Sequence, residues 1–396
     1  MSTNPRIYLD FNATAPLIPA AREAILAVTA ALAAVGNPSS IHREGRMARD
    51  LIEVARGRVA ALVGRPREQV VFTSGGTEAN ALGVLGLAGA IERRGGPRVV
   101  VGSSIDHPSL RGAVAALAQR GWEVRMLAVT PDGALVAGPA TDAGPAAAAG
   151  LAALLEGAGL LAVAAVNHEL GTLADIAGLA AAARAAGALV HVDAVQAAGK
   201  LDLAAIPADS LAISAHKLGG PAGAGALALG PDDALPLLDG GHQERGRRPG
   251  TENVVGIAGL GAAAAAAAAG LATWPEVAAL GDRLERVLLA LPGVRIHGSG
   301  APRVGGTVNA GFAGALGESI VVALDLAGIA ASTGAACTSG SVQPSPVLLA
   351  LGLSPREARS AVRFSLGRST TAAEIDAVLE RLPAIVARAR AHAPPA

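Results

Sequence analysis

Lys217, which closely follows an apolar run, is a candidate for covalent chemistry. Residues 209–214 (DSLAIS) have the composition of a buried strand, and the glycines and proline at 219–221 forbid its continuation. Lys217 is therefore predicted to lie on a turn at a strand end. A lysine that is partly removed from water beside other cations shifts toward its neutral, nucleophilic form, which can form a Schiff base with a carbonyl compound. A surface lysine without a catalytic role is the alternative.

Polar side chains also follow other apolar runs of the sequence. They are His107, His168, Asp193 and Gln196, which come after runs at 98–102, 160–166 and 188–192. The runs alternate with helical segments, which is typical of parallel βαβ units. The carboxyl ends of parallel strands lie at one edge of a sheet, where ligands bind in doubly wound folds. We therefore expect these side chains to lie near Lys217.

A glycine-rich turn joins a predicted strand at 69–73 to a predicted helix. The turn reads SGGTEAN over residues 74–80. Glycines let the backbone approach an anion, and the free amides of the first helical turn can hold a phosphate. The candidate phosphate ligands are Gly76 and Thr77 in the turn, together with Ser214 and His216 beside the lysine.

Taken together, these groups fit pyridoxal 5'-phosphate. A Schiff-base lysine on this cofactor needs a carboxylate partner for the pyridinium nitrogen, so that the ring stays protonated and acts as an electron sink. Asp193 can serve as that partner. The uncharged amide of Gln196 can donate a hydrogen bond to the phenolate oxygen.

The composition argues against several classes of partner and site. Lys+Arg and Asp+Glu both number 32 in 396 residues, so no net field favours nucleic acid or an anionic membrane. Residues 254–274 approach the length of a membrane span, but Ala and Gly in place of Leu and Ile favour a helix of a soluble protein. Residues 1–8 lack the apolar part of a secretory signal, which predicts a cytoplasmic protein. Cys337 is the single cysteine, so we expect no disulfide within the chain and no metal site.

The order of elements predicts an α/β protein with two domains. Residues 14–259 would form a large cofactor-binding domain with a mostly parallel sheet flanked by helices, and 260–396 a smaller α+β domain, joined by 1–13. The smaller domain holds Cys337 in a Gly/Ser/Thr-rich loop and Arg363 at an inward-facing strand position. The loop 240–253 has four glycines and three arginines, which suits the gripping of an anion; a solvated loop is the alternative.

Ordered motifs along nearly the whole chain resemble one family. The motifs are LDFNAT at 9–14, GNPSSIH at 36–42, TSGGTE at 73–78, SAHK at 214–217, RPGTEN at 248–253 and RFSLGR at 363–368. They are similar to those of the cysteine desulfurases of the aminotransferase class V family, of the nitrogen-fixation and iron–sulfur-assembly type. The resemblance implies the type I fold of pyridoxal-phosphate-dependent transferases and the conversion of L-cysteine to L-alanine.

The resemblance also implies roles for individual residues. Lys217 would carry the cofactor, His107 would stack over its ring and move protons, and Cys337 would take the substrate sulfur as a persulfide. Asn37 and Arg363 would hold the substrate carboxylate. Thr251 would reach the cofactor phosphate of the partner subunit in a homodimer, and the sulfur would pass to an acceptor or scaffold protein.

One departure from the family pattern falls beside the cofactor: His168 stands where the family usually has asparagine. Its imidazole could donate a hydrogen bond to the phenolate oxygen, and we expect it to titrate near neutrality, as an amide does not. A ring that only packs is the alternative. Alternative functions are a selenocysteine lyase or another class V lyase, and an inactive structural homologue.

Overall fold

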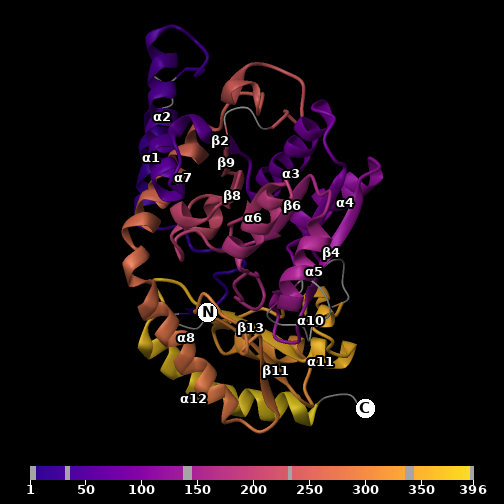
Figure 1. The fold of residues 1–396 in the computed structure, drawn as a ribbon. Helices are drawn as coiled ribbons and strands as arrows, with labels where there is room; N and C mark the ends of the chain where they lie inside the picture. Colours follow the sequence, from indigo (N-terminus) through magenta and orange to yellow (C-terminus); the bar gives the residue numbers. More distant parts are fainter. Residues whose placement is uncertain (1–5, 32–35, 137–144, 231–233, 335–342, 393–396) are drawn as a thin grey trace.

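The computed structural model describes residues 6–31, 36–136, 145–230, 234–334 and 343–392 (Figure 1). The main sheet has the strand order β2-β9-β8-β7-β6-β3-β4-β5. Its strands are β2 (Val70–Thr73), β3 (Val99–Ser103), β4 (Glu123–Val129), β5 (Leu135–Val136), β6 (Leu160–Ala164), β7 (Leu189–Asp193), β8 (Ser210–Ser214) and β9 (Gly225–Leu229). Neighbours from β8 through β7, β6 and β3 to β4 are parallel, whereas β9 and the edge strands β2 and β5 pair antiparallel. The predicted mostly parallel sheet is confirmed.

Helices cover both faces of this sheet, because its strands alternate buried side chains between the two faces. Leu160 and Ala162 of β6 pack with α3 (Gly76–Arg93) and α4 (Pro108–Gln119). Leu161 and Val163 face the other core, which contains α2 (Arg43–Val63), α6 (Ile176–Ala185) and α7 (Val254–Ala269). Helix α5 spans Pro145–Leu155.

Helices α1 (Pro19–Ala31) and α2 pack against α7 beside the β2–β9 end of the sheet (Figure 1). The alanines and glycines of α7 allow this close approach: a Cβ on Gly261 would lie 2.6 Å from Ala55 of α2. The sequence predicted one helix over 254–274, but α7 ends at Ala269. Arg368 donates to the carbonyls of Gly270 and Ala267 at that end, and Pro275 lies in the first turn of the next helix, α8 (Trp274–Leu289). The Ala- and Gly-rich composition of α7 therefore permits close packing against α2.

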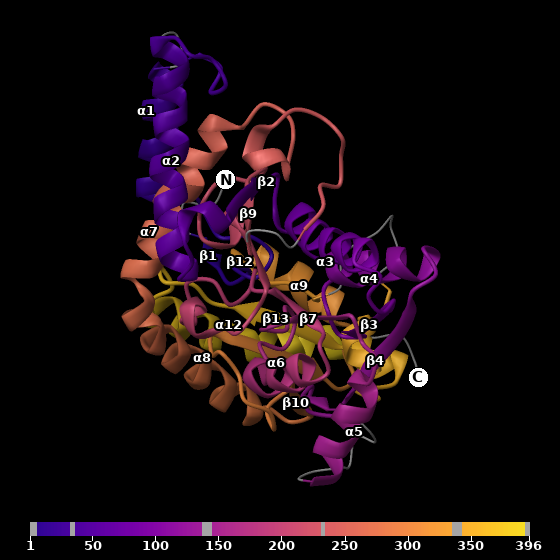
Figure 2. The same cartoon turned by 45° about the horizontal axis from the view of Figure 1, so that its top comes forward.

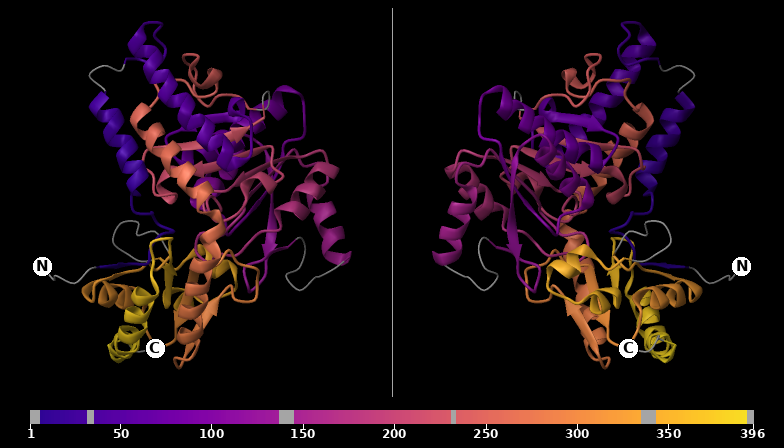
Figure 3. Two further views of the ribbon diagram at one scale, coloured as in Figure 1. Left: turned by 90° about the vertical axis from the view of Figure 1, so that its left-hand side faces the viewer. Right: turned by 90° about the vertical axis from the view of Figure 1, so that its right-hand side faces the viewer.

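The smaller core is formed by a three-stranded antiparallel sheet and the helices around it (Figure 3). The elements of this part are α8 (Trp274–Leu289), β10 (Val294–His297), β11 (Thr307–Phe312), α9 (Gly317–Leu326), β12 (Ile329–Ala330), α10 (Pro346–Ala350), α11 (Pro355–Arg359), β13 (Ala361–Ser365) and α12 (Ala372–Ala391). Figure 2 shows β1 (Ile7–Tyr8) beside β12, with which it pairs in parallel. The N-terminal segment therefore joins the small part to the large one.

The domain boundary between residues 259 and 260 stays a prediction, because α7 runs through it as one continuous helix. Among the described helices, no single one is long and apolar enough to cross a membrane. Residues Val254–Ala269 and Leu271–Leu289 reach that length and composition only as a pair bent by 54°.

Candidate active site

Lys217 lies on a short turn at the end of β8, as the sequence predicts. Its Nζ donates hydrogen bonds to the backbone carbonyls of Asn12 and Ala13, the latter at 2.8 Å. Burial, followed by the charge of Arg363, lowers the pKa of Lys217 to about 8. A fraction of this amine is therefore neutral and nucleophilic near pH 7, whereas an ordinary lysine is almost wholly charged.

Asp193 lies at the end of β7, which pairs in parallel with β8. Its Oδ1 accepts a hydrogen bond from the Val195 amide at 2.9 Å, and its Oδ2 accepts one from Asn80 Nδ2 at 2.8 Å. The pKa of Asp193 is raised, because the effect of burial exceeds the lowering by these two hydrogen bonds and by the neighbouring His107 and Lys217. Such a buried, oriented carboxylate is chemically suited to a pyridinium nitrogen.

His107 immediately precedes α4 and caps its N-terminus. Its Nδ1 accepts a hydrogen bond from the Ser109 amide at 3.1 Å and lies 2.8 Å from Ser109 Oγ. The His107 ring meets the His168 ring edge to face, with centroids 5.1 Å apart. Removal from water lowers the pKa of His107; Asp193 opposes this shift, and Lys217 adds to it. The imidazole is therefore mainly neutral near pH 7.

Hydrogen-bond donors without protein partners gather at the N-terminus of α3. The helix has Gly75 at its N-cap and no side-chain cap, so the amides of Gly76 and Thr77 have no acceptor within the helix. A Cβ on Gly76 would lie 2.9 Å from Val195 and 3.4 Å from Ser214. Ser214 Oγ is buried and has no hydrogen-bond partner among the described residues. A phosphate satisfies donors of this kind, so the residues present fit the phosphate group of pyridoxal phosphate.

His216 lies next to these donors but brings no positive charge. Its Nδ1 is 3.2 Å from Thr14 Oγ1. Burial, followed by the charge of Lys217, lowers the pKa of His216 to about 4. The ring is therefore neutral at pH 7, and it could contact a phosphate only as a hydrogen-bonding group.

Gln196 is tied to the N-terminal segment in a way that the sequence did not indicate. Its Nε2 donates to the Asn12 carbonyl at 2.9 Å, and its Oε1 accepts from Lys200 Nζ at 3.2 Å. Lys200 also donates to Asn12 Oδ1 at 3.1 Å, and burial lowers its pKa to about 7. The amide nitrogen of Gln196 carries a second hydrogen, and its donation to the phenolate oxygen stays a prediction.

Arg363 is buried in β13, at the inward-facing position that the sequence predicts. Its Nη1 donates to the His168 carbonyl at 3.0 Å, and its Nη2 pairs with Asp10 Oδ1 at 2.8 Å. Its Nε is buried without a partner among the described residues. The guanidinium thus keeps one unused donor close enough to Lys217 to influence the pKa of that lysine.

The expectation that His168 titrates near neutrality is wrong. Burial, followed by the charges of His107 and Arg363, lowers the pKa of His168 well below its ordinary value. The nearest carboxylate, Glu169, lies 3.7 Å from its Nε2. The ring is therefore neutral at physiological pH, since burial disfavours the imidazolium.

The other predicted site residues lie elsewhere. Asn37 lies in the segment 36–42 that precedes α2, and its Oδ1 accepts from the Ser39 amide at 2.9 Å. Thr251 is exposed in the loop before α7. No hydrogen bond among the described residues joins Asn37 or Thr251 to Lys217, and their roles stay predictions. Cys337 lies outside the described residues.

The arginines of the loop 240–253 are partly used by the protein itself, which the sequence did not predict. Arg248 Nε donates to Glu78 Oε1 at 2.8 Å, and Arg247 donates to the Gly230 carbonyl at 3.1 Å. Glu244 of the same loop forms a buried pair with Arg56 of α2. The expectation of three arginines that grip an anion therefore does not hold for Arg248, whose guanidinium already has a carboxylate.

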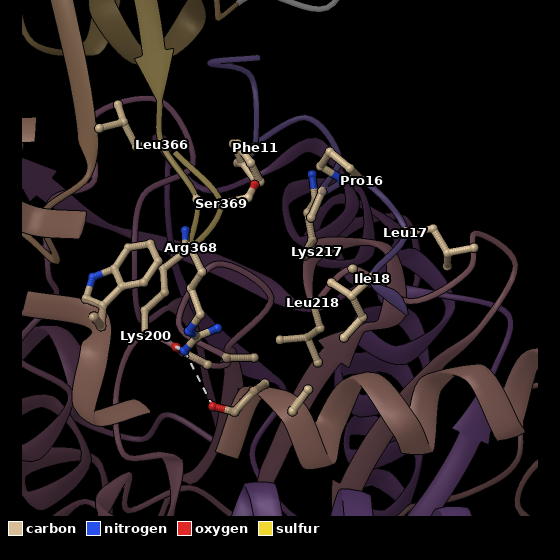
Figure 4. A pocket seen from close by; sticks show the side chains of 18 of the residues that line it. Phe11, Pro16, Leu17, Ile18, Lys200, Lys217, Leu218, Leu366, Arg368 and Ser369 are labelled. Carbon is tan, nitrogen blue, oxygen red and sulfur yellow. Dashed lines mark hydrogen bonds between the residues drawn. The ribbon is translucent and has the colours of Figure 1, made fainter. Parts of the chain in front are cut away.

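Lys217 also lines a cavity of about 430 Å³, to which the start of α1 and the end of α7 contribute (Figure 4). Figure 4 shows Lys217, Lys200 and Arg368 around this cavity, with Phe11 and Leu366 on its apolar wall. Asp193 and His107 do not line it. Within the described ranges, no group of three or more His, Cys, Asp or Glu side chains is placed to hold a metal ion.

The sequence did not indicate the polar residues that form hydrogen bonds to the candidate site residues or to each other beside them. They are Asn12, Asn80, Ser109 and Lys200. The one sequence signal for Asn80 is an amide among apolar residues of α3, a single turn after Thr77. For Lys200 the sequence signal is its position, because it follows Asp193 and Gln196 at the end of the same loop.

Comparisons with known proteins agree with this site. Residues 7–378 match the aminotransferase class-V family. The chain is 42% identical over 395 residues to a cysteine desulfurase of Cereibacter sphaeroides, with 98% of each chain covered. Among solved structures, it resembles a NifS-like protein (TM-score 0.86, 28% identity, 97% of this chain and 100% of that chain) and SspA in complex with cysteine (TM-score 0.75, 27% identity, 91% and 98%). The resemblance drawn from the motifs and the expected fold are confirmed, and the chain belongs to the aminotransferase class-V family, whose cysteine desulfurases use pyridoxal 5'-phosphate.

Proposed function

We propose that this enzyme converts L-cysteine to L-alanine and holds the released sulfur as a persulfide on Cys337. The observation that carries the proposal is the meeting of Lys217, Asp193 and the uncapped N-terminus of α3 at the ends of β8, β7 and β2. The cysteine desulfurase relatives and the neighbour solved with cysteine favour the sulfur substrate over selenocysteine.

The residues of this chain divide the work around the cofactor. Lys217 would carry pyridoxal phosphate, Asp193 would face its pyridinium nitrogen, and Gly76, Thr77, Ser214 and His216 would surround its phosphate. When bound, the cofactor supplies an electron sink for the substrate carbon. The neutral His168 and the amide of Gln196 are the groups expected at the phenolate oxygen.

The sulfur step needs no outside oxidant. The thiolate of Cys337 forms a bond to the substrate sulfur as the substrate carbon–sulfur bond breaks. The electron pair of that bond goes to the carbon, which takes up a proton and becomes the methyl group of alanine. His107, whose imidazole is mainly neutral and can therefore accept a proton, is the residue expected to move protons at the substrate.

Arg363 is proposed to bind the substrate carboxylate. Its buried, unpartnered Nε supports this role, because a charged donor left without an acceptor is costly and an incoming carboxylate would satisfy it. Asn37 is proposed to assist at a site across a dimer interface, since no hydrogen bond among the described residues joins it to Lys217.

A homodimer is proposed on similar grounds. Thr251 is exposed, while its loop is held to its own chain by the pairs Arg248–Glu78 and Arg56–Glu244. A loop anchored in this way can present Thr251 to the cofactor phosphate of a partner subunit. A sulfur-acceptor or scaffold protein and a cytoplasmic location complete the proposal; pull-down with the persulfidated enzyme and cell fractionation would test them.

The experiment that tests the proposed function compares the wild-type enzyme with Cys337→Ser. Wild-type protein treated with L-cysteine should release alanine and gain one sulfur atom at Cys337 in peptide mass spectra. Cys337→Ser should bind cysteine and change the cofactor spectrum but release no sulfide with a reductant. A wild-type protein that forms alanine without any persulfide at Cys337, or that prefers selenocysteine, would contradict the proposal.

A further inference from the structure

Asn80 connects the carboxylate of Asp193 to the imidazole of His107. Its side chain is buried in α3, and its Nδ2 donates to Asp193 Oδ2 at 2.8 Å and to Ser109 Oγ at 2.9 Å. Ser109 Oγ in turn lies 2.8 Å from His107 Nδ1. Two branches of hydrogen bonds therefore start at one amide group: one ends at Asp193, and the other runs through Ser109 to His107.

On its other side, the Asn80 amide oxygen faces His191. His191 Nε2 lies 3.1 Å from Asn80 Oδ1, and His191 Nδ1 lies 2.8 Å from Ser210 Oγ. Burial lowers the pKa of His191 to about 3, so this ring carries one proton. An amide oxygen only accepts, so that proton is on Nε2, and Ser210 donates to Nδ1. A Cβ on Gly83 would lie 2.3 Å from the His191 ring, which shows how closely α3 holds it.

The hydrogen-bond donors and acceptors around His107 likewise determine which of its ring nitrogens carries the proton. Asn80 uses one Nδ2 hydrogen for Asp193 and the other for Ser109 Oγ. Ser109 Oγ accepts there, so its own hydrogen points to His107 Nδ1, which also accepts from the Ser109 amide. A neutral imidazole whose Nδ1 accepts carries its proton on Nε2.

We propose that Asn80 is a positioning residue that keeps Asp193 ionised and His107 in the Nε2–H tautomer at the same time. The inference rests on the proposed roles of Asp193 and His107 at the cofactor. A reversed amide would place its oxygen against the Asp193 carboxylate, so the alternative orientation is disfavoured by repulsion between two acceptors. The two branches separate at Asn80, and each can be tested alone.

Four variants test this division in the cofactor-loaded enzyme. Asn80→Ala and Asn80→Asp change both branches, and Ser109→Ala changes only the branch to His107. Asn253→Asp, at the exposed N-cap of α7, is the matched control, because aspartate caps a helix as well as asparagine does. The readouts are the pH titration of the visible cofactor band and the pH profile of kcat, with KM for cysteine measured beside them.

Asn80→Ala should shift the midpoint of the band titration by about one pH unit or more, because Asp193 loses a donor that holds its pKa down. Its kcat should fall at least about tenfold while KM changes less than about twofold. In Asn80→Asp the new carboxylate faces Asp193, and the band should shift further in the same direction. Asn253→Asp should match the wild type in each measurement.

Ser109→Ala should leave the band titration unchanged and move the kcat profile to higher pH. The lost hydroxyl stabilises neutral His107, so its removal raises the pKa of that ring. The charged groups that face His107 are Asp193, Lys217 and Arg111, with the neutral His168 ring against it, and the variant leaves all of them in place.

A band titration of Asn80→Ala that superimposes on the wild type overturns the proposal, as does a Ser109→Ala variant that shifts the band equally. If Asn80→Ala fails to fold, the ¹⁵N spectrum of histidine-labelled wild-type protein decides, with His107→Gln for assignment. It should show the Nε2–H tautomer of His107, and an Nδ1–H tautomer overturns the proposal. A wild type that forms no persulfide would contradict the proposed function but leave the band and tautomer measurements valid.

Discussion

Arg363 in β13 and Asp10 in the N-terminal segment form an ion pair, with Arg363 Nη2 2.8 Å from Asp10 Oδ1. The pair joins two segments that are 353 residues apart and directs the guanidinium toward the site. It also places a carboxylate beside the donor group that is proposed to receive the carboxylate of the substrate.

Arg363→Ala should raise KM for cysteine at least about tenfold, because a charge-assisted contact to the substrate carboxylate is lost. The visible cofactor band should remain, since none of the proposed cofactor ligands is changed. Asp10→Asn should raise KM less, because the guanidinium keeps its bond to the His168 carbonyl. Arg283→Ala, which removes an exposed pair with Asp376, is the control. An unchanged KM in Arg363→Ala would assign the clamp to another residue.

Lys217 should capture pyridoxal phosphate at a rate that rises with pH through a midpoint near 8. The pKa of this lysine is lowered to about 8, and only the neutral amine above that value is nucleophilic. The measurement is the growth of the visible band when the apoenzyme is mixed with the cofactor at a series of pH values. Lys217→Ala should show no such band. A midpoint near 10 would mean that burial does not perturb this amine.

His168→Asn should leave the pH titration of the visible band unchanged. The pKa of His168 lies well below its ordinary value because the ring is buried among His107 and Arg363, so it stays neutral over the range measured. Neutral imidazole and amide each offer one donor to the phenolate oxygen. A midpoint that moves by more than about 0.5 unit would show that the imidazole gains a proton when the cofactor is bound.

Thr251→Ala should weaken cofactor binding only in the dimer. The exposed Thr251 is proposed to act at the cofactor phosphate of the partner subunit. The variant should therefore bind the cofactor more weakly while it still sediments as a dimer, as the wild type does. Thr273→Ala is a matched control, because that hydroxyl bonds only to the Gly270 carbonyl in its own turn. A monomer with full activity in dilute solution would contradict the role of Thr251 and the dimer together.

Glu244→Gln should destabilise the apoenzyme by about 3 kcal/mol, since it breaks a buried ion pair and leaves only the more exposed Glu53 as a carboxylate paired with Arg56. Glu244 accepts from Arg56 at 2.7 and 2.8 Å and from the Phe72 amide at 2.8 Å. These bonds hold Glu244 at a φ of 47°, a strained conformation for a residue other than glycine. Urea unfolding at one protein concentration measures the change. Glu123→Gln, which breaks an exposed pair with Arg125, is the control and should change the free energy of unfolding much less.

Short segments of the sequence were enough to predict the local chemistry of this protein. Lys217 lies on a turn because glycine and proline follow it, and the amides at Gly76 and Thr77 are free because a glycine-rich turn begins a helix without a cap. The alternation of apolar runs with helices predicted the mostly parallel sheet. These features depend on neighbours within one or two turns of chain, so composition and order reveal them.

Contacts between distant segments could be found only in the folded chain. Asn80 meets Asp193 across 113 residues, and Arg56 meets Glu244 across 188. No periodicity in either partner's own segment indicates such a pair, because packing of helix on sheet and loop on helix decides which polar groups meet. The neutral state of His168 has the same origin: its pKa depends on burial, and burial is a property of the assembled core rather than of the loop that carries the residue.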